Sequence, residues 1–284
     1  MTAHRLVLAA LLFLGWNAAS AQNLDFASGG NGAPVEIRAE QGLELVQNAK
    51  QIIARGNARA SRGSTTLAAD VILAHYRDGQ GAGGKTEIWR IEAQGHVVIS
   101  TPTQTITAEH GDYNIDKAAV ILTGNNLKLT TATDTVTARD SLEYLERTQQ
   151  AVARGDALAI HGTDRIRANV LTATMGPGEQ GKTSIRKIRA DDNVVLTTPR
   201  ETVTGDRGDY IVESGIVTLT GSVKMTRDNN QLDGGYAIVN LKSGVSRLLP
   251  TPPGSGTEGR VKGTFVPQSK NAPAPDARTP RPRP

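Results

Sequence analysis

The chain has 284 residues, of which 38% are hydrophobic, 4% are aromatic and none is cysteine, so disulfides and a thiol nucleophile are excluded. The formal net charge is +4, but residues 255–284 alone carry +4, and residues 22–254 carry −1. A basic nucleic-acid-binding face in the central part of the chain is therefore not expected.

The first 21 residues have the features of a secretory signal peptide. A basic start at His4 and Arg5 precedes an apolar run over residues 6–16, and residues 19–21 form a small-x-small cleavage site. We expect cleavage after Ala21, before Gln22, and export of the mature chain. The alternative is an uncleaved N-terminal anchor, although the apolar run is short for a membrane span.

Composition divides the exported part into three segments. Residues 22–34 are rich in Gly and Asn and predict a flexible arm, and apolar alternation begins at residue 35. Residues 43–53 fit a short helix or a strand pair about equally well. Residues 250–284 are rich in Pro and Arg and predict a disordered tail, either a solubilising segment or a contact with an acidic glycolipid or membrane surface. One domain over residues 35–249 is thus expected.

The main feature of this domain is a stretch that occurs twice. Residues 91–124 and 188–221 align without a gap at an offset of 97 residues and share 15 of 34 positions. Both copies are rich in Val, Ile and Thr and alternate apolar with polar residues, which is typical of β-strands. Such a regular internal period indicates a repeat architecture.

Degenerate copies of the unit extend over most of the domain. Each has a pivot residue between two alternating runs, and a glycine there suits a bulge or turn with positive φ. About two strands per unit predict an all-β fold of roughly 14–16 antiparallel strands. The pivots are Gly56, Gly95, Gly124, Gly155, Asp192 and Gly221.

Alternation also predicts which face each strand buries. Closing the apolar faces on each other would give a sandwich or jelly roll whose end strands are unpaired. The predicted inward row is Ile91, Ala93, Val97, Ile99, Val120 and Leu122, with the counterparts Ile188, Ala190, Val194, Leu196, Val217 and Leu219.

Catalytic and metal-binding motifs are missing from the sequence. His75, His96, His110 and His161 have no metal-ligand spacing, and no nucleophile or nucleotide motif is present. Gly-Asp-Tyr occurs at residues 111–113 and again at 208–210, and duplicated acids favour an architectural turn over a catalytic pair. We therefore predict a protein that is not an enzyme, with no metal and no cofactor.

The order of these motifs resembles the LptA/OstA-like lipopolysaccharide-transport family. The similarity covers about residues 35–245 and is carried by the opening PVEIRAEQGLEL and by repeated Gly pivots followed by T-x-T-A-(E/R). The stretches that carry it are 53–76, 91–113, 120–144 and 188–236. The chain departs from a minimal bridge protein in its Gly-rich inserts at 78–84 and 176–182, its basic tail, and the small Ala58 after Asn57.

The resemblance implies a twisted, open β-jellyroll in the periplasm that carries lipopolysaccharide, through its lipid A moiety, from the inner to the outer membrane. The inward row named above, together with Ile106 and Val203, would line the lipid groove. The expected partners are lipopolysaccharide, further copies stacked edge strand on edge strand, and matching jellyroll domains at each membrane.

Two other functions are compatible with the repeats. One is a non-catalytic β-solenoid that binds polysaccharide or has a structural role in the cell envelope. The other is a β-helical carbohydrate-active enzyme, which would need paired acids in a single copy, whereas the acids here are duplicated.

Overall fold

The computed structural model describes residues 35–79, 86–177, 183–255 and 259–265. Within these ranges the chain forms eighteen strands in one antiparallel sheet and no helix, which confirms the predicted all-β fold. The predicted signal peptide and arm, the larger part of both Gly-rich inserts, and the end of the tail lie outside the described residues.

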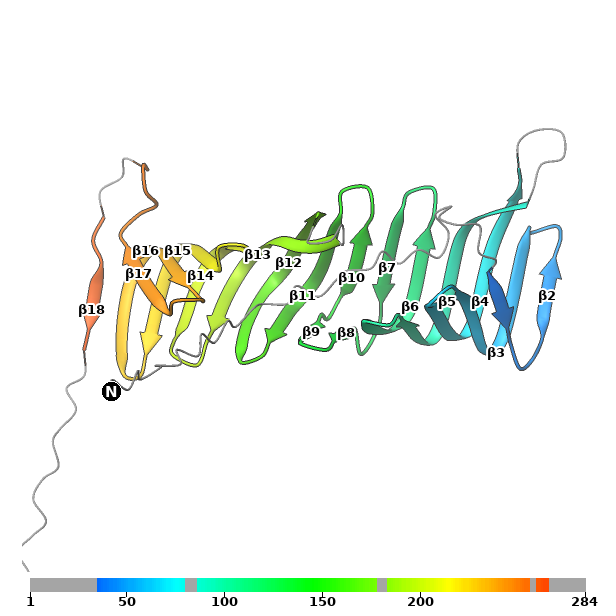
Figure 1. Cartoon of the computed structure of the whole chain (residues 1–284), viewed down its shortest axis with the longest axis horizontal. Coiled ribbons are helices and arrows are strands. Elements are labelled where there is room, and N and C mark those ends of the chain that lie inside the picture. The colour runs from blue at the N-terminus through cyan, green and yellow to red at the C-terminus, as the bar shows by residue number, and fades with distance from the viewer. Residues whose placement is uncertain (1–34, 80–85, 178–182, 256–258, 266–284) are drawn as a thin grey trace, which may run out of the picture.

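The strands lie side by side across the long axis of the molecule, in chain order from one end to the other (Figure 1). Their bounds are β1 (Glu36–Arg38), β2 (Leu43–Val46), β3 (Gln51–Arg62), β4 (Thr65–Asp78), β5 (Thr86–Ser100), β6 (Gln104–Asn114), β7 (Ala119–Thr123), β8 (Lys128–Thr131), β9 (Asp134–Thr137), β10 (Ser141–Leu145), β11 (Gln150–His161), β12 (Asp164–Pro177), β13 (Thr183–Thr197), β14 (Thr202–Ile211), β15 (Ile216–Arg227), β16 (Asn230–Asn240), β17 (Val245–Leu249) and β18 (Lys262–Thr264).

Several short strands are two halves of one bent strand. β1 and β2 both pair with β3, β7 and β8 both pair with β6, β9 and β10 both pair with β11, and β17 and β18 both pair with β16. Three bent strands are thus split at the bend, whereas β17 and β18 lie along the same partner strand but are separated by residues 250–261. The eighteen strands amount to fourteen crossings of the sheet, which is why the assigned number exceeds the 14–16 expected.

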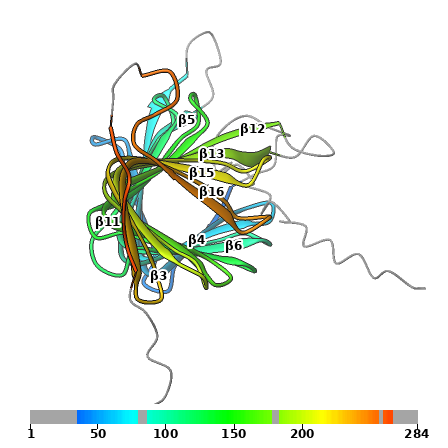
Figure 2. The same cartoon turned by 90° about the vertical axis from the view of Figure 1, so that its left-hand side faces the viewer.

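The bends coincide with the pivots predicted from the sequence. All six pivot residues have positive φ, from 62° at Asp192 to 96° at Gly124, which confirms the expectation. In the unbroken strands the residue after the pivot is also left-handed, as at Asn57, and the pairing register shifts there. The bends fold the sheet lengthwise, so the strands surround a common axis when viewed end-on (Figure 2).

The internal repeat is preserved in the pairing as well as in the sequence. Leu43 of β2 lies opposite Ala54 of β3, and Leu142 of β10 lies opposite Ala153 of β11. These two pairs differ by 99 residues at both positions, so β1 and β2 are the counterparts of β9 and β10. The first bent strand of the chain is therefore repeated in the middle of the sheet.

Two local expectations are decided by the structure. Residues 43–53 form the strand pair β2–β3 and not a short helix. The sheet also continues past the expected boundary at residue 249, because β18, which comes from the predicted tail, pairs with Gln231–Asp233 of β16.

Candidate functional site

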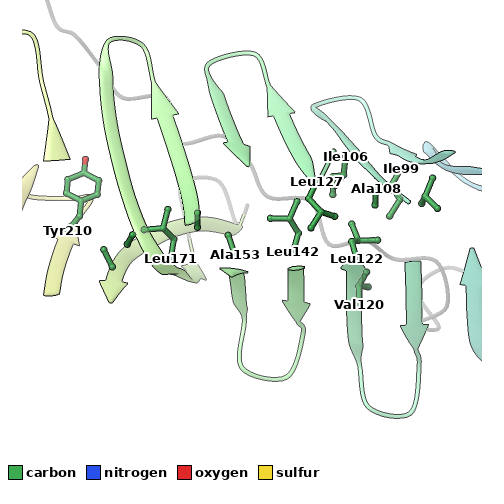
Figure 3. Close-up of a cluster of buried hydrophobic side chains, with 14 of the residues drawn as sticks. Ile99, Ile106, Ala108, Val120, Leu122, Leu127, Leu142, Ala153, Leu171 and Tyr210 are labelled. Carbon is green, nitrogen blue, oxygen red and sulfur yellow. The ribbon is translucent and has the colours of Figure 1, made fainter. Parts of the chain in front are cut away.

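The lengthwise fold divides the sheet into two facing halves, which are called walls below. The apolar side chains of both walls face the interior and form one hydrophobic cluster along the long axis (Figure 3). All fourteen residues predicted to face inward belong to this cluster or pack against it. Ile188 is half-buried, and the other thirteen are buried, with Ala190, Val203 and Leu219 at 0% exposed. Burial of aliphatic side chains is the main stabilising contribution to a fold with so few aromatic residues.

The interior is packed unequally along its length. Between β4 and β7 a cavity of only about 30 Å³ is left between the walls. In the middle of the sheet a larger cavity of about 280 Å³ lies between the segments from β6 to β16. Its aliphatic lining includes Leu129, Val136, Leu142, Leu171, Ala173, Met175, Ile188, Leu196, Val217 and Leu241.

Polar residues border this central cavity at the turns between β8 and β9 and between β11 and β12. His161 Nδ1 lies 2.6 Å from Asp134 Oδ1, and Thr131 donates to the other oxygen of the same carboxylate at 3.0 Å. Burial raises the pKa of Asp164 at the next turn, and burial also raises the pKa of Tyr210 from the facing wall. The site therefore combines an aliphatic interior with a hydrogen-bonding rim.

The two Gly-Asp-Tyr motifs lie inside strands β6 and β14, so the expectation that they form turns is wrong. A side chain at Gly111 would come within 3.2 Å of Leu122, which explains the glycine as space for the opposite core residue. The tyrosines are buried in the interior, and the aspartates face outward. Because neighbouring residues of a strand point to opposite faces, the motif divides its roles between the two sides of the wall.

The outward aspartates are held by basic side chains of the preceding strand. Asp112 accepts from Arg90 Nε at 3.0 Å. Burial opposes the ionisation of Asp209, but hydrogen bonds from Lys187 and Arg189 outweigh it and hold the pKa of Asp209 below its usual value. These ion pairs fix the outer face and leave no pair of free carboxylates at the motif.

Three of the four histidines in the described part of the chain, His75, His96 and His161, each contact one acidic side chain. His75 Nε2 lies 2.8 Å from Glu92, and His96 Nδ1 lies 2.9 Å from Asp70. The side chain of His96 is 89% exposed. Among the residues with assigned positions, no group of three or more His, Asp or Glu side chains is placed to hold a metal ion. No helix in that part of the chain is long and apolar enough to cross a membrane.

A model of the family described as LptA/(LptD N-terminal domain) LPS transport protein matches the chain twice, over residues 36–140 and 135–245. The chain belongs to this family. The two matches correspond to the two halves of the internal repeat, so the long sheet consists of two family units joined through β7 to β10. The family is one of lipopolysaccharide-transport proteins, as the resemblance in sequence implied.

Two further proteins are similar over part of the chain. Uncharacterized protein R00383 of Rhizobium meliloti (strain 1021) is 31% identical over 101 residues, which cover 35% of this chain and 54% of that protein. The chain thus matches about half the length of this relative. LptH of Pseudomonas aeruginosa, described as the LptA homologous periplasmic component of a lipopolysaccharide transport device, is 17% identical, with a TM-score of 0.41 over 47% of this chain and 95% of that one.

The central cavity includes only some of the residues predicted to line a groove. Ile106, Val120, Leu122, Ile188, Leu196 and Val217 line it. Ile91, Ala93, Val97 and Ile99 line the small cavity, together with Val120 and Leu122. Ala190, Val194, Val203 and Leu219 border neither cavity and fill the packed section toward the C-terminal end.

Sequence reasoning missed the lining residues between β8 and β12, such as Leu129, Leu142 and Leu171. They lie outside the stretch that is repeated most clearly, so comparing the two copies did not select them. A signal was present nonetheless, because Leu142 aligns with Leu43 at an offset of 99 residues within the segment that also contains the pivots Gly56 and Gly155.

Proposed function

We propose that this protein is a non-catalytic, periplasmic carrier of lipopolysaccharide, which binds the acyl chains of lipid A between its two walls and passes the lipid from the inner to the outer membrane. The single observation that carries the proposal is the central cavity of about 280 Å³ with its aliphatic lining. Each methylene transferred from water to such a lining contributes about 0.8 kcal/mol.

Movement of the lipid along the interior requires that the walls separate locally. The cavity of about 30 Å³ between β4 and β7 is too small for an acyl chain, and at the other end Val203 and Leu219 are fully buried. The central section is therefore proposed as the resting site of the acyl chains. Because hydrophobic contact is non-directional, the chains can slide past the lining residues without breaking specific bonds.

The edge strands support the proposed assembly with matching jellyroll domains and with further copies. In the middle of the sheet, Leu142 of β10 lies opposite Leu122 of β7 and is 9% exposed. Leu43, its counterpart in the edge strand β2, is 56% exposed. A strand added to β2 in the manner of β7 would cover Leu43 and continue the sheet, which is the usual mode of β-augmentation.

Filling the central cavity tests the lipid-binding proposal. Ala173→Trp places a bulky ring at a lining position, and Thr172→Trp places the same ring on the other face of β12, outside the lining. We expect Ala173→Trp to weaken binding of fluorescent lipopolysaccharide at least about tenfold, and Thr172→Trp to change it less than about twofold. Equal binding by both variants and the unmodified protein would place the lipid elsewhere.

Export and assembly have separate tests. N-terminal sequencing of protein recovered from the periplasm is expected to begin at Gln22.

Sedimentation at increasing protein concentration is expected to show end-to-end oligomers, and a monomer at all concentrations would contradict stacking of copies. Binding of a neutral polysaccharide in place of lipopolysaccharide would favour the alternative structural function in the envelope.

A further inference from the structure

We propose that a clamp between the two lips of the folded sheet closes the C-terminal end of the central cavity and acts as a gate for the lipid. Successive turns of the meander lie alternately along the two long edges of the folded sheet, and these two rows of turns are the lips. The first lip contains the β13–β14 turn, and the second contains the β16–β17 turn. The clamp consists of Arg200 and Glu201 on the first lip with Gly244 and Ser246 on the second. This inference rests on the proposed lipid-carrying function.

The contacts of the clamp join segments more than forty residues apart. Ser246 Oγ donates a hydrogen bond to Glu201 Oε1, and Arg200 Nη1 donates to the Gly244 carbonyl oxygen at 3.4 Å. The contact between His161 and Asp134, by comparison, stays on the first lip. The two lips are thus tied directly at the C-terminal end.

Glu201 is built into the clamp as a buried charge. Its side chain is only 3% exposed, and its second oxygen lies 2.8 Å from Arg227 Nη2 on the first lip. A buried carboxylate is stable only while its oxygens are satisfied by hydrogen bonds and a counter-charge. Opening the lips removes the Ser246 hydrogen bond, but Arg227 stays with Glu201. The carboxylate therefore remains paired in the open state, which makes opening feasible without unfolding.

The clamp lies next to two lining residues of the central cavity in the chain. Leu196, which lines the cavity, is the penultimate residue of β13, just before the first-lip turn. Leu241, which also lines the cavity, lies in the second-lip turn that contains Gly244. Because the interior beyond the cavity is packed, as at Val203 and Leu219, a lipid can move from the cavity toward β17 only if the walls separate beside these two turns. Tying the turns together therefore blocks that path, and parting them opens it.

A reversible crosslink tests the gate. The chain has no cysteine, so the pair Glu201→Cys and Ser246→Cys can be joined by a short bifunctional methanethiosulfonate and released with a reducing agent. The matched control joins Asp116→Cys to Arg147→Cys, two positions in contact on the second lip alone, where Arg147 donates to the Asp116 carbonyl oxygen. Loading and release of fluorescent lipopolysaccharide are followed by stopped flow, with affinity measured at equilibrium.

We expect the joined clamp to slow both loading and release at least about tenfold while the dissociation constant changes less than about twofold, and reduction to restore both rates. Ser246→Ala, which only weakens the clamp, is expected to speed release. Unchanged rates in the joined protein, with lipid still bound, would overturn the gate and leave the carrier function standing. Absence of lipid binding by the unmodified protein would overturn the carrier function and the gate together.

Discussion

Asp206 of β14 lies directly over Gly221 of β15, so that a methyl group added to this glycine would come within 2.1 Å of the carboxylate oxygen Oδ2. Gly221 is also left-handed, with φ of 78°. The same arrangement of an acid over a pivot glycine occurs at Asp70 with Gly95. Two independent features, backbone conformation and lack of space, thus require glycine at these bends.

Gly221→Ala is therefore expected to lower the free energy of unfolding by about 1–3 kcal/mol, as measured by urea denaturation. The matched control is Asp192→Gly at the one pivot that is not glycine and has φ of 62°. Removing a side chain from a left-handed residue is expected to be neutral or to stabilise by up to about 1 kcal/mol. A large loss of stability in the control would mean that the Asp192 side chain supports the bend.

Packing along the interior predicts unequal costs for the same truncation. Leu219 is 0% exposed in the packed section, whereas Leu171 borders the central cavity. Leu219→Ala is expected to lower the free energy of unfolding by about 3–5 kcal/mol. Leu171→Ala is expected to lower it by only about 2 kcal/mol, because part of the Leu171 surface already faces empty space. Equal losses of unfolding free energy in the two variants, measured by thermal and urea unfolding, would contradict the unequal packing.

The pair of His96 and Asp70 predicts a defined pH dependence. Their hydrogen bond raises the pKa of His96 above its usual value near 6.5. A raised pKa in the folded state means that this pair stabilises the fold below the unfolded-state pKa and that the stabilisation is lost as pH rises through the folded-state pKa. The effect is small because His96 is exposed.

NMR titration of the His96 ring checks this directly. In Asp70→Asn the titration midpoint of His96 is expected to fall toward the usual value, while that of a distant histidine stays unchanged. An unchanged His96 midpoint in the variant would show that the contact does not persist in solution.

Leu43 predicts the behaviour of the N-terminal edge. Leu43→Lys is expected to abolish concentration-dependent oligomers in sedimentation experiments, because a charge replaces the apolar contact that an added strand would bury. Stability of the monomer is expected to change by less than about 0.5 kcal/mol, since the side chain is exposed. Ile121→Lys, at an exposed position in the middle of the sheet, is the matched control and is expected to leave assembly unchanged.

Much of the fold was predictable because it depends on short-range properties of the chain. Alternation along residues 91–99 assigns Ile91 and Val97 to the inner face, and the repeated pivots mark the bends through their need for positive φ. The same local rules fail where a bulge changes the alternation. On β4 the buried residues are Leu67 and Ala69, then Ile72 and Ala74, so the inward positions change from odd to even at the bend.

The sequence by itself determined the antiparallel repeats, their bends, the apolar face and the family, since each depends on residue type and spacing. Only the tertiary structure decided where the interior is open. Both walls are aliphatic along their length, so the difference between the packed row at Leu219 and the cavity at Leu171 depends on the distance between walls that meet only in the folded state. The contact of Glu201 with Ser246 was equally hidden, because nothing local in the sequence relates two turns that the fold brings together.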